Sequence, residues 1–135
     1  MRCYVHRKGA ARAFGPGTPG ISLPYRALGQ PVIVPGSMGE TSWVMLATRD
    51  AMSKSFGSAC HGAGRTMSRH EASYHGDPIL DDQLENRGVR VRSSDASTSG
   101  GVQLKENIDA VVDTVSGAGL AGKVARLKPL AVVHG

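Results

Sequence analysis

The chain has 135 residues, enough for one domain with a hydrophobic core and too few for two. Its 16 lysines and arginines outnumber its 11 acids, and the resulting net charge of +5 favours polyanionic partners. No apolar stretch approaches the roughly 18 residues of a membrane span, so neither a span nor a secretory signal is predicted. Aromatic residues make up only 4% of the chain, which argues against an open base-stacking platform.

The first half predicts loops and short strands. Residues 1–28 are rich in glycine and proline and are expected to be loop-dominated, because three prolines prevent a long helix. The apolar runs 32–34 and 43–46 predict two strands joined by a Gly/Ser-rich loop. Residues 49–56 predict a short helix or turn.

The second half predicts helices and further strands. Asp77, followed by Pro78, begins a helix that is expected to run to residue 86, and residues 89–91 predict a short strand. A Ser/Gly-rich surface loop follows at 93–101.

Apolar residues at helical spacing predict a helix from Ile108 to about Gly117. Residues 121–133 predict one last strand, with Pro129 at an edge or a bend. The pattern as a whole indicates an α+β fold with mixed sheets and short helices, in a single domain over residues 1–135.

The segment 58–69 carries the strongest chemical signal. His61 is followed by Gly62 and Gly64, whose open backbone suits a phosphate, and then by Arg65 and Arg69, which can grip phosphate oxygens in two-pronged fashion. A histidine at such a place can transfer a proton or attack phosphorus. The competing interpretation is an ordinary turn histidine.

The Gly/Ser-rich loop between the first two predicted strands offers hydroxyls from Ser37, Thr41 and Ser42. It is either a polar hairpin tip or a second phosphate or base cradle facing His61. Neither loop matches the two common glycine-rich phosphate-binding patterns. We expect the two loops to converge from neighbouring strands.

Four blocks in order resemble the RtcB-type RNA ligases, enzymes that join RNA 3′-phosphate (or 2′,3′-cyclic phosphate) ends to 5′-hydroxyl ends with GTP and manganese, as in tRNA splicing and RNA repair. The blocks are His-Arg-Lys-Gly-Ala from His6, Gln-Pro-Val-Ile-Val-Pro-Gly-Ser-Met-Gly from Gln30, Cys-His-Gly-Ala-Gly-Arg from Cys60 with Met-Ser-Arg behind it, and the tail from Val124 to Leu130. The resemblance implies the C-terminal portion of that family's catalytic domain, working in the cytoplasm.

The resemblance also implies roles. His61 stands where the family carries its guanylylated histidine, and a neutral imidazole is a suitable nucleophile. The implied nucleotide-binding residues are Ser37, Ser42, His61, Gly62, Ala63, Gly64 and Arg65, with Lys105 and His134 at two further positions. The implied RNA or phosphate surface comprises Arg7, Lys8, Arg12, Arg65 and Arg69.

Departures from the family concern the base and the metal. Lys105 falls about where a base-packing tyrosine is usual, and His134 replaces a lysine near the guanine, so guanine recognition is weakened or different. The family's manganese ligands lie upstream of the first block, and His70 and His75 are five residues apart, unlike the usual helical metal spacing. We predict no metal site within this chain. Cys60 is expected to be a small half-buried residue and, like Cys3, to stay reduced.

Three hypotheses follow for function. The chain supplies the guanylylated histidine to a missing metal-binding half, with an archease-type activator as a further candidate partner. Alternatively, it is a non-catalytic module that binds nucleotide or RNA, or an inactive truncated ligase fragment with exposed apolar surface.

Overall fold

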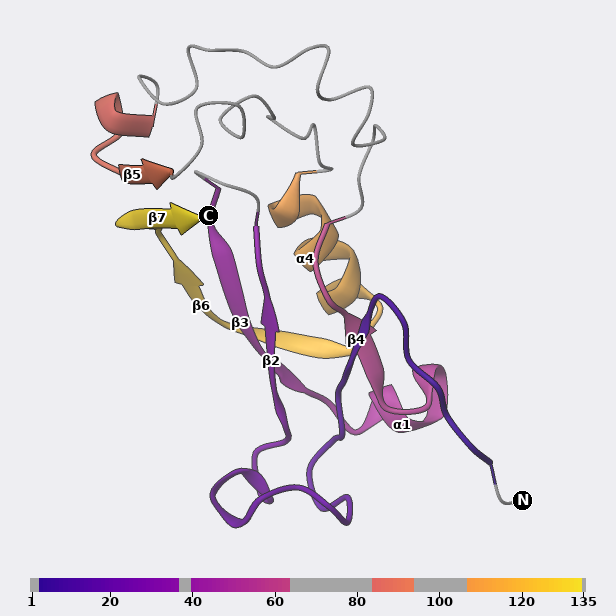
Figure 1. Cartoon of the computed structure of the whole chain (residues 1–135). Helices are drawn as coiled ribbons and strands as arrows, with labels where there is room; N and C mark the ends of the chain where they lie inside the picture. Colours follow the sequence, from indigo (N-terminus) through magenta and orange to yellow (C-terminus); the bar gives the residue numbers. More distant parts are fainter. Residues whose placement is uncertain (1–2, 37–39, 64–83, 94–106, 135) are drawn as a thin grey trace.

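The computed structural model describes residues 3–36, 40–63, 84–93 and 107–134, with backbone alone for 91–93 and 132–134 (Figure 1). The elements that it contains are, in chain order, β1 (Ala10–Arg12), η1 (Leu23–Tyr25), β2 (Pro31–Val34), β3 (Ser42–Ala47), α1 (Asp50–Ser55), β4 (Ser58–Cys60), β5 (Arg90–Ser93), α4 (Ile108–Gly117), β6 (Ala121–Leu127) and β7 (Ala131–His134).

A three-stranded antiparallel sheet in the order β2-β3-β6 forms the centre of the molecule. The predicted strand–loop–strand unit is confirmed, since β2 and β3 pair with Ile33 opposite Val44. The pairing of β3 with β6 shifts register after Val44, which marks a bulge or irregularity in the ladder. The loop between β2 and β3 therefore joins strands that are paired directly.

The hydrophobic core lies between one face of this sheet and α4. Val32 and Val34 are buried while Ile33 between them is 63% exposed, as the alternation of side chains along a strand requires. The helix contributes buried residues one turn apart, and its predicted extent to Gly117 is confirmed. The buried cluster comprises Ala13, Val32, Val34, Met45, Ala47, Ala59, Ile108, Val112, Val115 and Ala121.

Two segments about fifty residues apart are joined by the β1–β4 pair. The strands run antiparallel, with Ala10 opposite Cys60 and Arg12 opposite Ser58. Before β1 the chain is irregular, and the predicted loop character of residues 1–28 is interrupted only by β1 and the single turn η1 in the described part. The pair places the N-terminal basic block beside the histidine segment.

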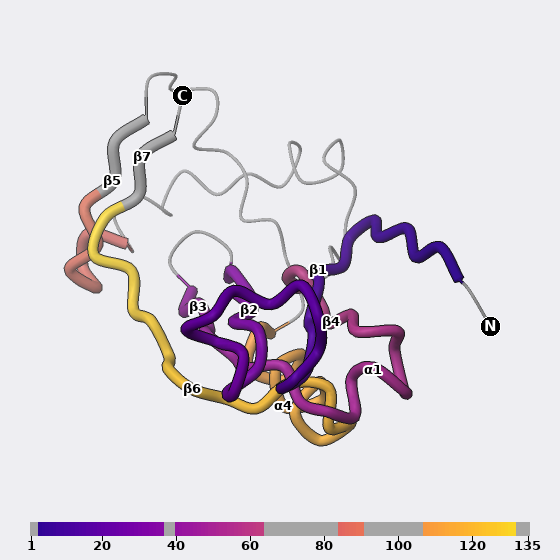
Figure 2. Tube along the Cα trace, turned by 90° about the horizontal axis from the view of Figure 1, so that it is seen from below, coloured from indigo at the N-terminus to yellow at the C-terminus, as the bar shows by residue number. Residues whose placement is uncertain are grey.

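The prediction of one strand over residues 121–133 was wrong, whereas the bend predicted as one possibility for Pro129 is confirmed. The structure has β6 and β7 in different sheets, separated at Lys128–Leu130, with β7 parallel to β5. Pro129 has no N–H for a ladder and so favours a break between the strands. Figure 2 shows the chain leaving the central sheet along β6 before it reaches the β5–β7 pair.

Other predictions are confirmed in part. The helix α1 lies within the predicted segment 49–56. Of the predicted helix 77–86 only residues 84–86 are described; they are helical and end in a turn at Gly88, whose φ is +75°. The strand expected at 89–91 is β5, which begins one residue later and includes Ser93, the first residue of the predicted loop 93–101; the rest of that loop lies outside the described residues.

The fold is therefore mixed α and β with short helices, as predicted, but none of the described sheets is mixed: the β1–β4 and β2-β3-β6 sheets are antiparallel and the β5–β7 pair is parallel. None of the helices within the described ranges is both long and apolar enough to span a membrane.

Candidate functional site

His61 is the first residue after β4 and is exposed. Its imidazole makes no hydrogen bond or ion pair with any residue that the structure describes. A histidine without an internal partner keeps both ring nitrogens available, one as donor and one as acceptor in the neutral form. With respect to the described residues, the side chain is available to an external group.

The strand that presents His61 is hydrogen-bonded at its start by Arg7. The Arg7 guanidinium donates to the Ser58 hydroxyl at 2.9 Å and to the carbonyl oxygens of Phe56 and Gly57 at 2.9 and 3.2 Å. These three bonds tie the N-terminal block to the start of β4, and the β1–β4 ladder continues the attachment. Arg7 thus has a positioning role that the sequence alone did not reveal.

The two predicted loops converge next to His61. A Cβ placed on Gly62 would lie 3.4 Å from the carbonyl oxygen of Pro35 and 3.9 Å from its Cγ, so the chain after β4 touches the chain after β2. The expectation that neighbouring strands bring them together was wrong, because β2 and β4 belong to different sheets. Packing of both strands in the common core, through Val34 and Ala59, does so instead.

The base of the Gly/Ser-rich loop is closed by Ser42. The Gly36 N–H donates to the Ser42 hydroxyl oxygen at 3.2 Å. A Cβ at Gly36 would come within 2.2 Å of the Thr41 carbonyl oxygen, which no side chain allows. Glycine is therefore required here, and the loop begins and ends at nearly the same place. Ser42 keeps its own O–H as a donor.

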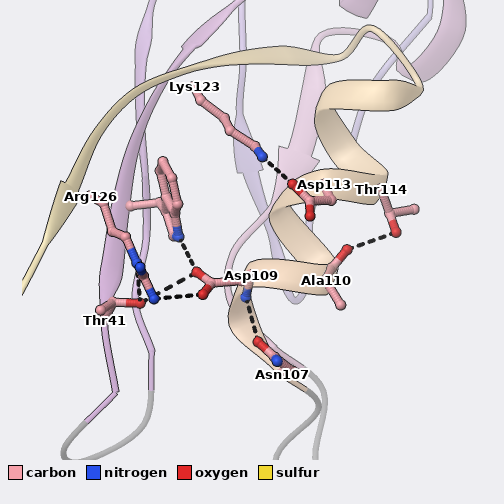
Figure 3. Close-up of polar contacts among 9 residues, drawn as sticks. Thr41, Asn107, Asp109, Ala110, Asp113, Thr114, Lys123 and Arg126 are labelled. Carbon is pink, nitrogen blue, oxygen red and sulfur yellow. Dashed lines mark hydrogen bonds and ion pairs between the residues drawn. The ribbon is translucent and has the colours of Figure 1, made fainter.

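A polar network that was not predicted from the sequence lies at the end of this loop, where it joins Thr41 and β3 to α4 and β6 (Figure 3). The Asp109 carboxylate accepts a hydrogen bond from the Trp43 indole N–H at 2.7 Å and pairs with the Arg126 guanidinium at 2.7 Å. Thr41 completes it, with its hydroxyl 3.4 Å from Asp109 and 3.3 Å from the Arg126 Nε.

Two sequence signals could have pointed to this network. Asn107 caps α4 by accepting from the Asp109 N–H at 2.9 Å, which places the aspartate in the first turn of the helix. The chain's single tryptophan needs a partner for its indole N–H when half-buried. Nothing in the sequence states that the two meet.

The three predicted N-terminal cations differ in availability. Arg7 is engaged as described, and Arg12 donates from Nε to the Gln30 side-chain oxygen at 3.1 Å. Both guanidinium groups also lie over the Phe14 ring, at 5.7 and 5.0 Å from its centroid. Lys8 is exposed and has no polar partner among the described residues.

The structure describes the other predicted site residues only in part. Ala63 is half-buried and packs against the core, whereas His134 is the last residue of β7 and only its backbone is described. The remaining predicted residues, Ser37, Gly64, Arg65, Arg69 and Lys105, lie outside the described part of the chain, as do His70 and His75.

Cys60, next to His61, is half-buried and packs against the core, as predicted. Burial raises the pKa of its thiol, an effect opposed by a hydrogen bond involving its backbone, so it is a poor nucleophile compared with the exposed Cys3. In the described ranges no group of three or more His, Cys, Asp or Glu side chains could hold a metal ion.

Comparison with known proteins covers the whole chain. The family model for tRNA-splicing ligase RtcB matches residues 1–135. The tRNA-splicing ligase RtcB of Pyrococcus abyssi (strain GE5 / Orsay) is 48% identical over 141 residues, covering 100% of this chain and 15% of that protein. The corresponding protein of Archaeoglobus fulgidus is 45% identical over 143 residues, with 100% and 29% covered.

A eukaryotic relative shows the same relationship. The RNA-splicing ligase RtcB homolog 1 of Entamoeba dispar is 43% identical over 141 residues, with 100% of this chain and 26% of the relative covered. The chain thus spans 15 to 29% of the length of these relatives. The match along its full length shows that this chain belongs to the tRNA-splicing ligase RtcB family.

Proposed function

We propose that this chain supplies the guanylate-accepting histidine and the nucleotide loops of an RNA ligase that joins 3′-phosphate ends, or 2′,3′-cyclic phosphate ends after opening, to 5′-hydroxyl ends. The observation that carries the proposal is the position of His61. Its imidazole is exposed and without a polar partner in the described structure, at the point where three separate sequence blocks meet.

The chemistry begins with attack by a neutral imidazole nitrogen of His61 on the α-phosphorus of GTP. A P–N bond forms as the P–O bond to the leaving pyrophosphate breaks. An oxygen of the RNA 3′-phosphate then attacks the same phosphorus, and histidine leaves. Finally the 5′-hydroxyl oxygen attacks the activated 3′-phosphate, loses its proton and displaces GMP.

The local backbone suits a phosphate. Gly62 has no side chain, and apart from its chain neighbours Pro35 is the one described residue within 4 Å of the position that its Cβ would take, which favours approach of phosphate oxygens to the main-chain N–H groups of Gly62 and Ala63. The Ser42 hydroxyl holds the facing loop closed and keeps one donor for the nucleotide. Arg65 and Arg69 are proposed to hold phosphate oxygens, and Ser37, Lys105 and His134 to contribute to nucleotide binding.

Manganese, which the family resemblance implies, does not fit the described part of this chain, where no cluster of potential ligands occurs. We propose that the ligands are supplied by further residues of a longer protein or by a second polypeptide, since the chain corresponds to 15 to 29% of its relatives.

The test uses GTP labelled on its α-phosphate, with Mn²⁺, followed by a denaturing gel. The chain is assayed alone and together with the N-terminal portion of a relative. We expect a labelled band with the wild-type chain and none with His61→Ala. The control variant His6→Ala should keep the band, because both histidines are exposed but only His61 lies at the loop junction. A band that survives in His61→Ala, or no band even with the N-terminal portion present, overturns the proposal.

A second function, binding of RNA without catalysis, is favoured by the absence of a metal-ligand cluster among the described residues and by the net charge of +5. It predicts salt-sensitive RNA binding that persists in His61→Ala with no covalent adduct under any condition. Absence of RNA binding by the wild-type chain removes it.

A further inference from the structure

A hollow of about 440 Å³ lies between the end of β6, the turn that precedes β5 and the residue before β3. Among the described residues that line it, three side chains are cationic and one carries a hydroxyl; these residues are Thr41, Arg87, Val89, Arg126, Lys128 and Pro129. We name it the basic pocket. Arg126 and Lys128 lie within the tail block of the resemblance, but none of the three cations is among the predicted nucleotide-binding residues or the predicted phosphate surface.

Arg126 is held in a defined orientation at the wall of the basic pocket. One terminal nitrogen pairs with Asp109 at 2.7 Å, and Nε donates to the Thr41 hydroxyl at 3.3 Å (Figure 3). The side chain is nevertheless 54% exposed. Because a guanidinium carries five N–H donors, its second terminal nitrogen remains available to an anion.

The other two cations have no counter-charge among the described residues. Arg87 and Lys128 are exposed, and within the described ranges neither side chain makes a hydrogen bond or an ion pair. Of the pocket's three cations, only Arg126 is paired with a described carboxylate. Like charges gathered around one hollow repel one another, and an anion bound between them relieves that repulsion.

We propose that the basic pocket binds a backbone phosphate of a single RNA strand. A phosphate offers several acceptor oxygens to cations on different walls, and guanidinium groups match its geometry. The apolar walls, Val89 and Pro129, suit the sugar or base beside the phosphate. The proposal rests on the proposed function for its choice of RNA, and it adds a contact surface built by β6 and the Arg87–Val89 turn.

The experiment measures binding of a fluorescent single-stranded RNA about twelve nucleotides long, by anisotropy over a range of salt concentrations. The RNA has hydroxyls at both ends, and neither GTP nor Mn²⁺ is present. Binding is thus independent of guanylylation at His61, and the two proposals can fail separately. The test variant is Arg87→Gln/Lys128→Gln.

The matched control is Arg26→Gln/Arg49→Gln, which removes the same charge from two exposed arginines outside the basic pocket. We expect the test variant to bind about tenfold more weakly and to lose about one unit of salt slope per contact, with less than about a twofold change in the control. Circular dichroism melting checks that both variants fold, which the exposure of all four side chains favours.

Competition separates the sources of phosphate. The labelled RNA is displaced from the wild-type protein with inorganic phosphate, with GTP, with chloride of equal ionic strength or with unlabelled RNA. If phosphate and GTP displace it no better than chloride does, while unlabelled RNA displaces it, the pocket holds a strand rather than a free anion. Equal weakening of both double variants would mean that net charge alone attracts RNA, and this overturns the proposal. No RNA binding by the wild type, or a test variant that binds like the wild type, overturns it as well.

Discussion

Replacing Asp109 by alanine removes the acceptor at the centre of the polar network at the end of the Gly/Ser-rich loop. The lost hydrogen bond from Trp43, half-buried and to a charged acceptor at 2.7 Å, contributes about 1.5 kcal/mol. The Arg126 pair is 54% and 36% exposed, so it contributes only about 0.5 kcal/mol. The negative charge at the first turn of α4 adds about 0.5 kcal/mol.

We therefore expect Asp109→Ala to lower the free energy of unfolding by about 2.5 kcal/mol, or the melting temperature by about 10 °C. The assay is urea denaturation followed by circular dichroism, because the tryptophan fluorescence itself changes when its partner is removed. The matched control is Asp113→Ala on the same helix. Its carboxylate pairs with Lys123 but is 63% exposed, so its loss costs about 0.5 kcal/mol or less.

A double-mutant cycle with Trp43→Phe isolates the central bond. We expect a coupling energy of about 1 kcal/mol between Asp109 and Trp43, because their groups are in direct contact. If Asp109→Ala and Asp113→Ala destabilise the chain equally, or if the cycle shows no coupling, the network does not stabilise the fold and the reasoning is refuted.

Three other substitutions or reactions test separate features. Gly36→Ala should lower the free energy of unfolding, measured with urea, by about 2 kcal/mol, because the added Cβ would lie 2.2 Å from a backbone carbonyl oxygen. Gly117→Ala is the control and should not lower it, because no described atom beyond its own helix and chain neighbours lies within 4 Å of its Cβ position. Equal effects of the two substitutions would contradict this. Arg7→Lys should cost about 1–2 kcal/mol through its three lost hydrogen bonds, and an unchanged denaturation midpoint would show that they contribute nothing. Iodoacetamide should alkylate Cys3 before Cys60, because burial raises the pKa of the Cys60 thiol, as mass spectrometry would show; the reverse order would contradict this. Because the pKa of Cys60 is higher in the folded than in the unfolded state, its protonated thiol contributes to the free energy of unfolding below the unfolded-state pKa. This contribution is lost as the pH rises through the folded-state pKa, and Cys60→Ala should remove that pH dependence.

The local elements followed from the sequence because each is set by short-range physics. The apolar runs that became β2 and β3 and the helical spacing from Ile108 depend on neighbours within a few residues, whereas the exposure of Ile33 was decided by the face of the sheet that the core covers. The same holds for the family blocks, whose residues could be read directly. His61 was identified as the nucleophile candidate from such a block, and its role in catalysis stays a prediction.

Long-range arrangement was decided by the tertiary structure. The predicted strand 121–133 became two strands in different sheets, because pairing partners such as β5 lie far along the chain. Arg7 reads as a free cation in the sequence, yet it is bonded to residues about fifty positions away. Asp109 gained Trp43 and Arg126 as partners only when α4, β3 and β6 came together.

The sequence by itself determined the family, the short elements and the residues capable of phosphate chemistry, since these depend on residue type and local spacing. Only the tertiary structure decided that the loops at Pro35 and Gly62 touch, and that Arg87 lies at the same pocket as Arg126 and Lys128 from a distant segment. The physical reason is that such contacts depend on the packing of distant strands into a common core, which no local pattern encodes.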